Sequence, residues 1–172
     1  MHHPVPRIPA QPAPHRMEIE ARLTVELASV VAGARRRALR DGDRQVDTAH
    51  LLHSLIESDP AVGAAFEGAA QLARVLGYLV QRSIGYGLRW RASAESGPGP
   101  VIGSGSWSPV AAAAMERALE RAALRGEQRA SGLDVLAVLA ADPDCRAVEV
   151  LLRAGVDPGA LTGRIAELSQ QV

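Results

Sequence analysis

The chain has 172 residues, which suits one domain or two small units that share a core. Its 19 basic residues, all of them arginine, balance 19 acidic residues, so no overall charge draws the protein toward nucleic acid or anionic lipid. The absence of lysine excludes a P-loop lysine, a Schiff base and a lysine general base. The single cysteine, Cys145, cannot form an internal disulfide, and no apolar run reaches the ~18 residues of a membrane span. These observations predict a cytoplasmic protein.

Residues 1–17 are rich in proline and contain no apolar stretch of the length found in signal peptides. We expect a disordered, partly polyproline arm there. The helical pattern begins after it. In "LTVELASVVAGARRRALRDG" apolar residues recur at helical spacing, with Thr24 as N-cap and Gly42 as the end. In "DTAHLLHSLIE" either Asp47 or Thr48 is the expected N-cap of a second helix, and "QLARVLGYLVQRSIG" predicts a further helix in this half.

Residues 92–106 are rich in glycine, serine and proline and predict a linker, beyond which the pattern of the first half returns. Placing Ser108 on Thr24 puts Gly126 on Gly42, so a cap, a long helix and a stop recur in the same order. Pro109 is then the first residue of the second long helix.

Further caps follow in matching order. Asp59 with Pro60 predicts the start of a short helix in the first half, and Asp142 with Pro143 repeats this pair with a slip of one residue. Ser131 and Asp134 form a predicted capping box, and Asp157 caps the last helix. The sequence therefore predicts an all-α, pseudo-twofold tandem repeat of about 70–80 residues per copy. Its eight helices are divided between residues 18–91 and 107–172.

This arrangement resembles the Clp N-terminal domain, the substrate- and adaptor-docking module of ClpC, ClpA and ClpB unfoldases. The resemblance is carried by "TAHLLHSLI", which is similar to Gly-Thr-Glu-His-Ile-Leu-Leu-Gly-Leu in the family, and by "WSPVAAAAMERAL", which is similar to Phe-Thr-Pro followed by a helix. It covers about residues 20–168. Without lysine the chain has no Walker A motif, so the resemblance implies a free-standing Clp N domain with no ATPase motor, and not an enzyme.

The resemblance also implies a ligand site in a groove between the repeats. Trp107 lies where the family has an aromatic residue in the groove that takes cyclic-peptide antibiotics, and a Trp face with one N–H donor suits peptide binding. Met115, Glu116 and Leu119 follow on the same helix, with Val31 expected opposite them. Each has a structural alternative: Trp107 as a hydrophobic staple, the apolar residues as core and Glu116 as part of a solvated face.

Phosphoarginine-reading members of the family carry a glutamate directly before the histidine of the second helix in each repeat. Here those positions hold Ala49 and Leu133, so we expect no phosphoarginine recognition of the usual kind. His50 and His53 are a conceivable metal pair, but a packed or capping His50 is favoured, and no metal or cofactor is expected.

The predicted function is non-catalytic binding of peptides, adaptors or cyclic-peptide antibiotics, as an accessory factor or decoy of the ClpC–ClpP system. The alternative keeps the fold and changes the ligand. In it, the arginines at 35–37 with Arg40 and the N-terminal arm bind DNA as a transcriptional regulator. Three successive helical residues point in different directions, and the net charge is zero, so a solvated face is favoured over a nucleic-acid site.

Overall fold

The computed structural model describes residues 19–84, 95, 101–102 and 105–170, and gives only the backbone of residues 101–102 and 105–106. The predicted proline-rich arm at 1–17 lies outside the described residues. After a helical turn at residues 19–21, the described elements are α2 (Val25–Arg40), β1 (Gln45–Val46), α3 (Thr48–Ser58), α4 (Pro60–Gly63), α5 (Ala69–Ile84), β2 (Val101–Ile102), β3 (Gly105–Trp107), α6 (Pro109–Leu124), α7 (Gly132–Ala141), α8 (Arg146–Arg153) and α9 (Pro158–Gln170). The predicted all-α fold of two four-helix sets, α2–α5 and α6–α9, is confirmed.

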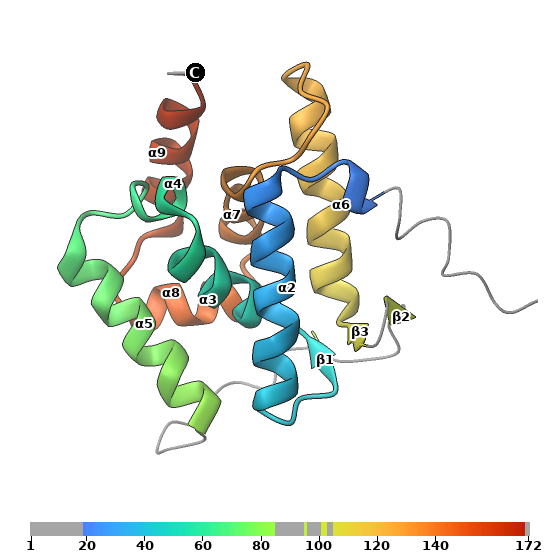
Figure 1. Ribbon diagram of the computed structural model, residues 1–172. Helices are drawn as coiled ribbons and strands as arrows, with labels where there is room; N and C mark the ends of the chain where they lie inside the picture. Colours follow the sequence, from blue (N-terminus) through green and yellow to red (C-terminus); the bar gives the residue numbers. More distant parts are fainter. Residues whose placement is uncertain (1–18, 85–94, 96–100, 103–104, 171–172) are drawn as a thin grey trace, which may run out of the picture.

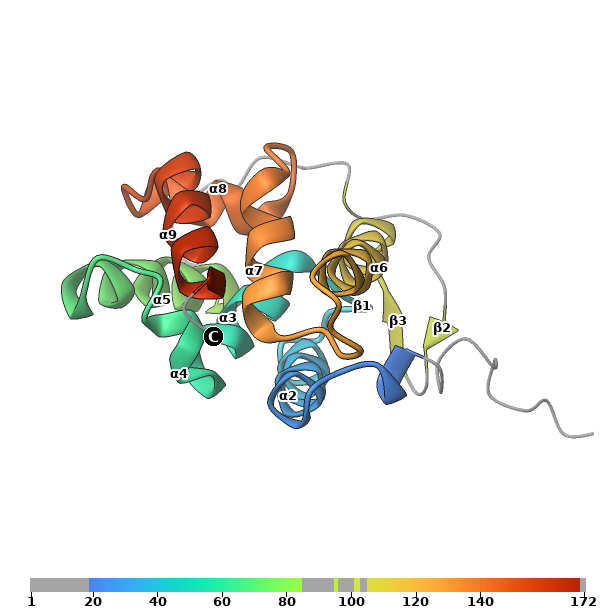
Figure 2. The ribbon, with the colours of Figure 1, turned by 90° about the horizontal axis from the view of Figure 1, so that it is seen from above.

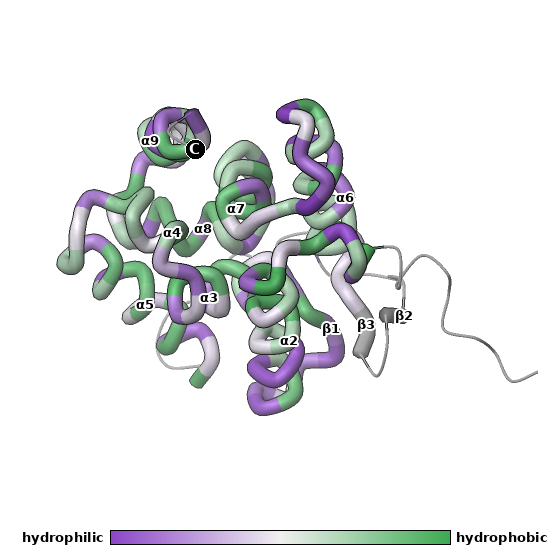
Figure 3. The backbone as a smooth tube through the Cα atoms, turned by 45° about the horizontal axis from the view of Figure 1, so that its top comes forward, coloured by the Kyte–Doolittle hydropathy of each residue, from purple (hydrophilic) through white to green (hydrophobic). Residues whose placement is uncertain are grey.

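Helices α3 and α7 occupy the middle of the molecule. Helices α2 and α6 lie on one side of them, running in opposite directions, and α4, α5, α8 and α9 lie on the other (Figures 1 and 2). The tube of α7 is mostly hydrophobic along its length, as expected for a helix that is covered on several sides (Figure 3).

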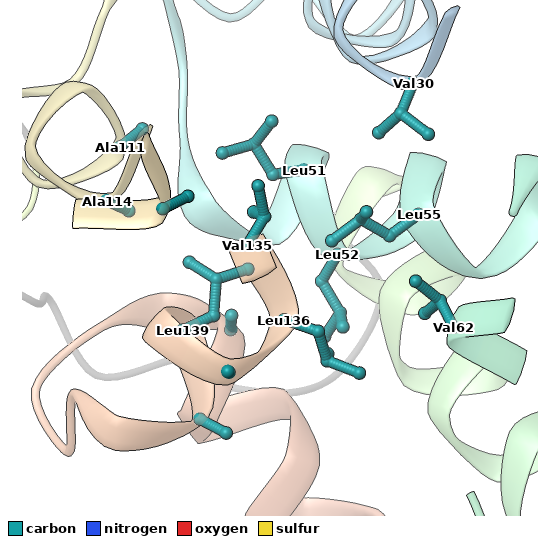
Figure 4. Close-up of a cluster of buried hydrophobic side chains, with 14 of the residues drawn as sticks. Val30, Leu51, Leu52, Leu55, Val62, Ala111, Ala114, Val135, Leu136 and Leu139 are labelled. Atoms are coloured by element: carbon teal, nitrogen blue, oxygen red, sulfur yellow. The ribbon is translucent and has the colours of Figure 1, made fainter. Parts of the chain in front are cut away.

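The core forms where α3 and α7 meet (Figure 4). Leucines at successive positions of α3 interdigitate with apolar residues of α7, and side chains of α2, α4 and α6 close the cluster. The labelled members are Val30, Leu51, Leu52, Leu55, Val62, Ala111, Ala114, Val135, Leu136 and Leu139, each at most 5% exposed. Burial of one such leucine contributes about 1.5–3 kcal/mol, so this contact between the repeats stabilises the whole domain.

Both long helices begin and end in the predicted way. The Thr24 hydroxyl accepts a hydrogen bond from Leu27 N at the start of α2, and the Ser108 hydroxyl accepts one from Ala111 N at the start of α6. Gly42 and Gly126 then have φ of 72° and 78°. This left-handed conformation, which glycine adopts without steric cost, ends each helix.

Short backbone pairings join the two repeats in a reciprocal manner. In the first, β1 pairs with β3 in parallel, with Val46 opposite Trp107, and Ser108 N donates to Val46 O at 2.9 Å. In the second, Leu23 forms a bridge with Ala130, and Thr24 N donates to Ala130 O at 2.9 Å. The residue before each long-helix cap is thus held by the other repeat. Sequence periodicity did not predict these pairings.

The structure decides where α3 and α8 begin. Between the two candidates for α3, Asp47 is the N-cap, and Thr48 is the first helical residue. The prediction that Asp142 with Pro143 starts a helix is wrong, because Asp142 is the C-cap of α7 and α8 begins only at Arg146. Its N-cap residue is Cys145, whose thiol makes no capping hydrogen bond. Strand β2, the first two residues of β3 and the described residue Glu95 lie within the predicted linker at 92–106.

Candidate functional site

Trp107 lies at the end of β3, immediately before the cap of α6, and its side chain is only 2% exposed. The guanidinium carbon of Arg35 on α2 lies 5.8 Å from the centre of its ring, which is within the range of a cation–π contact. The indole Nε1 is buried and has no hydrogen-bond partner among the described residues. A buried N–H without a partner costs free energy. Packing of the ring and the contact with Arg35 offset this cost and hold Trp107 in place.

The other predicted groove residues are divided by their exposure. Val31 on α2 and Met115 and Leu119 on α6 are 4–5% exposed and belong to the same hydrophobic core as Trp107. Glu116, the next residue on α6, is exposed. Val31 is one helical turn before Arg35, so both are on the face of α2 that is turned toward Trp107. We call Val31, Arg35, Trp107, Met115 and Leu119 the α2–α6 seam.

The seam is closed in this conformation. Its apolar members present almost no surface to solvent, whereas Arg35 is partly exposed and Glu116 beside the seam is exposed. An open groove lies elsewhere on α6, against α7. It has a volume of about 210 Å³, and its lining includes Val110, Arg117, Val138 and Asp142.

The arginines of α2 are partly engaged with acidic groups. Arg37 forms a short salt bridge with Glu57, and Arg35 Nη1 lies 3.7 Å from Glu20 Oε1. Arg36 and Arg40 are exposed. Because two of the four arginines have carboxylate partners within the fold, the cluster presents less positive charge than its sequence suggests.

His50 is a capping residue. Its Nδ1 accepts a hydrogen bond from Asp47 N at 3.0 Å, while the Asp47 carboxylate accepts one from His50 N, which completes a capping box. In the neutral ring the proton is then on Nε2, which donates to Asp43 at 2.8 Å, with Asp41 at 3.8 Å. These three side chains have the spacing of a metal cluster. A metal at Nε2 would have to displace that proton, so the hydrogen bonds favour a structural role.

The corresponding position of the second repeat carries a fully buried carboxylate, Asp134. It completes a capping box with Ser131 and forms salt bridges with Arg121 and Arg125. Burial alone would raise the pKa of Asp134, but hydrogen bonds from Arg125, the Ser131 backbone and Arg121 outweigh burial and hold that pKa below its usual value.

His53 is also buried, and its Nε2 lies 3.0 Å from Glu57. Burial lowers the pKa of His53, the neighbouring Arg37 lowers it further, and the opposing effect of Glu57 is smaller. His53 therefore favours the neutral form. Cys145 is buried, and burial raises the pKa of its thiol to about 11, which makes it a poor nucleophile at neutral pH.

A cluster that the sequence did not reveal lies where α3 and α8 begin. The Asp47 carboxylate forms salt bridges with Arg82 of α5 and Arg146 of α8. Burial would raise the pKa of Asp47, but His50, Arg82 and Arg146 lower it on balance. Beside this cluster the carboxylate of Glu95, only 1% exposed, accepts hydrogen bonds from both repeats. The one signal in the sequence was Cys145, a residue that caps poorly at a helix start.

Comparison with known protein structures identifies this fold. The structure matches the N-terminal domain of the caseinolytic-protease-associated chaperone ClpD from Arabidopsis thaliana with a TM-score of 0.67 and 19% identity, over 87% of this chain and 96% of that one. The chain has the Clp N-domain fold. The Hsp104 N-terminal domain from Candida albicans matches with a TM-score of 0.64 and 14% identity, over 86% and 91%. The N-terminal domain of the ClpV1 ATPase from the E. coli EAEC Sci1 T6SS matches with 0.61 and 16%, over 90% of each chain.

These structural matches establish the Clp N-domain fold. No protein-family model matches the sequence, and no curated protein is significantly similar to it. Among the described residues, no helix has the length and apolar character needed to cross a membrane.

Proposed function

We propose that this protein is a non-catalytic, cytoplasmic binding module that takes a peptide, an adaptor segment or a cyclic-peptide antibiotic at the α2–α6 seam. In this role it is an accessory factor or a decoy of a ClpC–ClpP proteolytic system. The observation that carries the proposal is the Clp N-domain fold, which the chain shares with domains of a chaperone associated with caseinolytic protease and of a T6SS ATPase.

The composition of the seam supports this location. The seam joins a tryptophan and a methionine with two aliphatic side chains from both repeats, and tryptophan and methionine are enriched at the centres of protein interfaces. The Trp107 indole N–H has no partner among the described residues, so a ligand carbonyl that reached it would satisfy a buried donor.

Because the seam is closed, a ligand contacts the exposed and the buried residues of the predicted site one after the other. Glu116 is the exposed member of the predicted site, so a ligand meets this carboxylate first, which favours ligands with a cationic group. Contact with Val31, Trp107 or Leu119 requires α2 and α6 to separate. If the open state is a small fraction of the population, the apparent affinity is the affinity of the open state multiplied by that fraction.

A decoy needs no catalysis. It protects a target by mass action when its concentration exceeds that of the ligand and its affinity is comparable to that of the target. An accessory factor would instead be recovered together with Clp subunits.

Fluorescence of Trp107 tests the proposal directly. In a Trp90→Phe background Trp107 is the only tryptophan, so its emission reports on the seam. Titration with a cyclomarin-type cyclic peptide is expected to shift the emission and raise the Tm, and Glu116→Ala is expected to weaken binding about tenfold, a loss of roughly 1.4 kcal/mol. The matched control is Glu120→Ala, an exposed glutamate one turn further along α6.

Pull-downs from the native cytosol separate the two roles. Recovery of Clp subunits by the wild type and the Glu120→Ala control, and not by Glu116→Ala, would support an accessory factor. Absence of any fluorescence or thermal shift with cyclic peptides, together with equal recovery by all three proteins, would contradict the role of the seam.

A further inference from the structure

The N-terminal ends of three helices converge on one carboxylate. Thr48 N, at the first position of α3, and Arg146 N, at the first position of α8, both donate to Glu95, the latter at 2.8 Å. The hydroxyls of Thr48 and of Ser108, the N-cap of α6, donate to the same carboxylate at 2.9 and 3.3 Å. These donors belong to both repeats.

The two hydroxyls act as donors toward Glu95. Each also accepts a backbone amide: the Thr48 hydroxyl accepts Ala147 N and the Ser108 hydroxyl accepts Ala111 N, both at 3.0 Å. Each hydroxyl thus accepts from the amide of a helix start and donates to the carboxylate. The backbone N–H groups of Thr48 and Arg146 can only donate, and a deprotonated carboxylate accepts from all four groups.

Electrostatics agree with the hydrogen bonds. The first turns of α3, α6 and α8 direct the positive ends of their helix dipoles toward Glu95, which favours an anion there. Next to Thr48, the Asp47 carboxylate forms salt bridges with Arg82 and Arg146. Thr48 and Ser108 have no exposed surface, so solvent contributes little to holding the anion.

Cys145 explains why a residue from outside these helices is needed. Its thiol donates to Leu139 O at 3.4 Å and makes no cap, so α8 lacks a capping group of its own. In the related junction of the other half, the N-cap residue Asp59 caps α4 and its carboxylate lies against Gly132, the first residue of α7. There the helix cap itself supplies the carboxylate.

We propose that the starts of α3, α6 and α8 form a carboxylate-binding site, and that Glu95 is its intramolecular ligand. The site is separate from the α2–α6 seam, and the inference does not rest on the proposed function. Because the site takes an oxyanion by its donors and not by its connection to the chain, a free carboxylate such as acetate binds there once the Glu95 side chain is removed.

Chemical rescue of Glu95→Ala tests the site. The variant is expected to unfold about 5–10 °C below the wild type, since buried charged hydrogen bonds are lost from a domain of this size. At pH 7, sodium acetate is expected to raise its Tm with a logarithmic dependence on concentration, and sodium chloride of equal ionic strength to have a smaller effect. The difference in Tm between acetate and chloride is expected to be small, and equal, in the wild type and the control Glu120→Ala.

Glu95→Gln separates charge from shape. The amide fills the space of the carboxylate but directs an NH₂ group at a donor, so the Tm is expected to fall and acetate is expected to give no rescue. A wild-type Tm for Glu95→Gln would overturn the inference. So would an acetate response of Glu95→Ala no larger than that of the control. If Glu95→Ala does not fold in chloride, its refolding yield in acetate against chloride replaces the Tm, and equal yields overturn the inference.

Discussion

Two capping boxes among the described residues have the same backbone geometry but use different acceptors, an imidazole in one and a carboxylate in the other. In the first repeat His50 occupies the third helical position and faces Asp41 and Asp43. In the second repeat Asp134 occupies that position and faces Arg121 and Arg125. The backbone amide of each N-cap residue requires an acceptor, which a neutral imidazole or a carboxylate can supply. The surrounding charges decide which of the two is stable.

The largest effect is expected from Asp134→Ala. It removes the acceptor of the capping box and the partner of two arginines, so the free energy of unfolding is expected to fall by about 3 kcal/mol. Urea denaturation measures this loss, with Glu120→Ala, which lies on the exposed face of α6, as control. A loss no greater than that of the control would show that the arginines find other partners.

A charge exchange in the first repeat tests the comparison itself. His50→Asp keeps an acceptor for the cap but places a further carboxylate beside Asp41, Asp43 and the buried Asp47, so we expect a loss of about 2 kcal/mol. Adding Asp41→Arg, which copies Arg125 of the second repeat, is expected to recover about 1 kcal/mol. If the two changes are simply additive in urea unfolding, the charge environment does not decide the residue at this position.

Leu23 and Trp107 give a second comparison, because each precedes the cap of a long helix and pairs with the other repeat. Trp107→Leu copies the first repeat and is expected to cost about 1.5 kcal/mol through lost packing, and to abolish the contact with Arg35. Thermal unfolding measures the cost. If the seam binds ligand, this variant also loses the ligand-induced rise in Tm. If Trp107 is purely structural, the ligand-induced rise in Tm is the same in the variant and the wild type.

The smallest effect is expected from titration of His53, which the second repeat replaces with Ala137 in the aligned position. The folded pKa of His53 is lowered, so the native state binds fewer protons than the unfolded state, and stability falls as the pH drops below about 6.5. We expect a loss of less than about 1 kcal/mol between pH 7.5 and 5.5, reduced in His53→Gln. The lowered pKa values of Asp47 and Asp134 act only below about pH 4. An unchanged slope in His53→Gln would assign the effect to other groups.

Local signals in the sequence accounted for most of the fold. The caps at Thr24, Ser108 and Ser131 and the stops at Gly42 and Gly126 are confirmed because each depends on neighbouring residues. Asp142 with Pro143 misled the prediction, because a proline after an aspartate can follow the end of one helix as well as begin the next.

Contacts between distant residues could not be predicted in the same way. The pairing of Val46 with Trp107 and the approach of Glu95 to Thr48 and Arg146 depend on how the two repeats fold against each other. The exposure of Trp107 was undetermined for the same reason, since a buried staple and an exposed ligand contact have the same local sequence. The predicted ligand role of the seam stays a prediction.

The reciprocal backbone pairing has a consequence for how such a chain is divided. Thr24 N and Ala130 O bond across the repeats, and so do Ser108 N and Val46 O. Either half alone would leave these groups unpaired and would expose the apolar faces of α3 or α7. Two separate copies of one repeat would satisfy the same bonds by exchanging them between chains. The arrangement is that of an isologous homodimer whose two subunits are joined into one polypeptide.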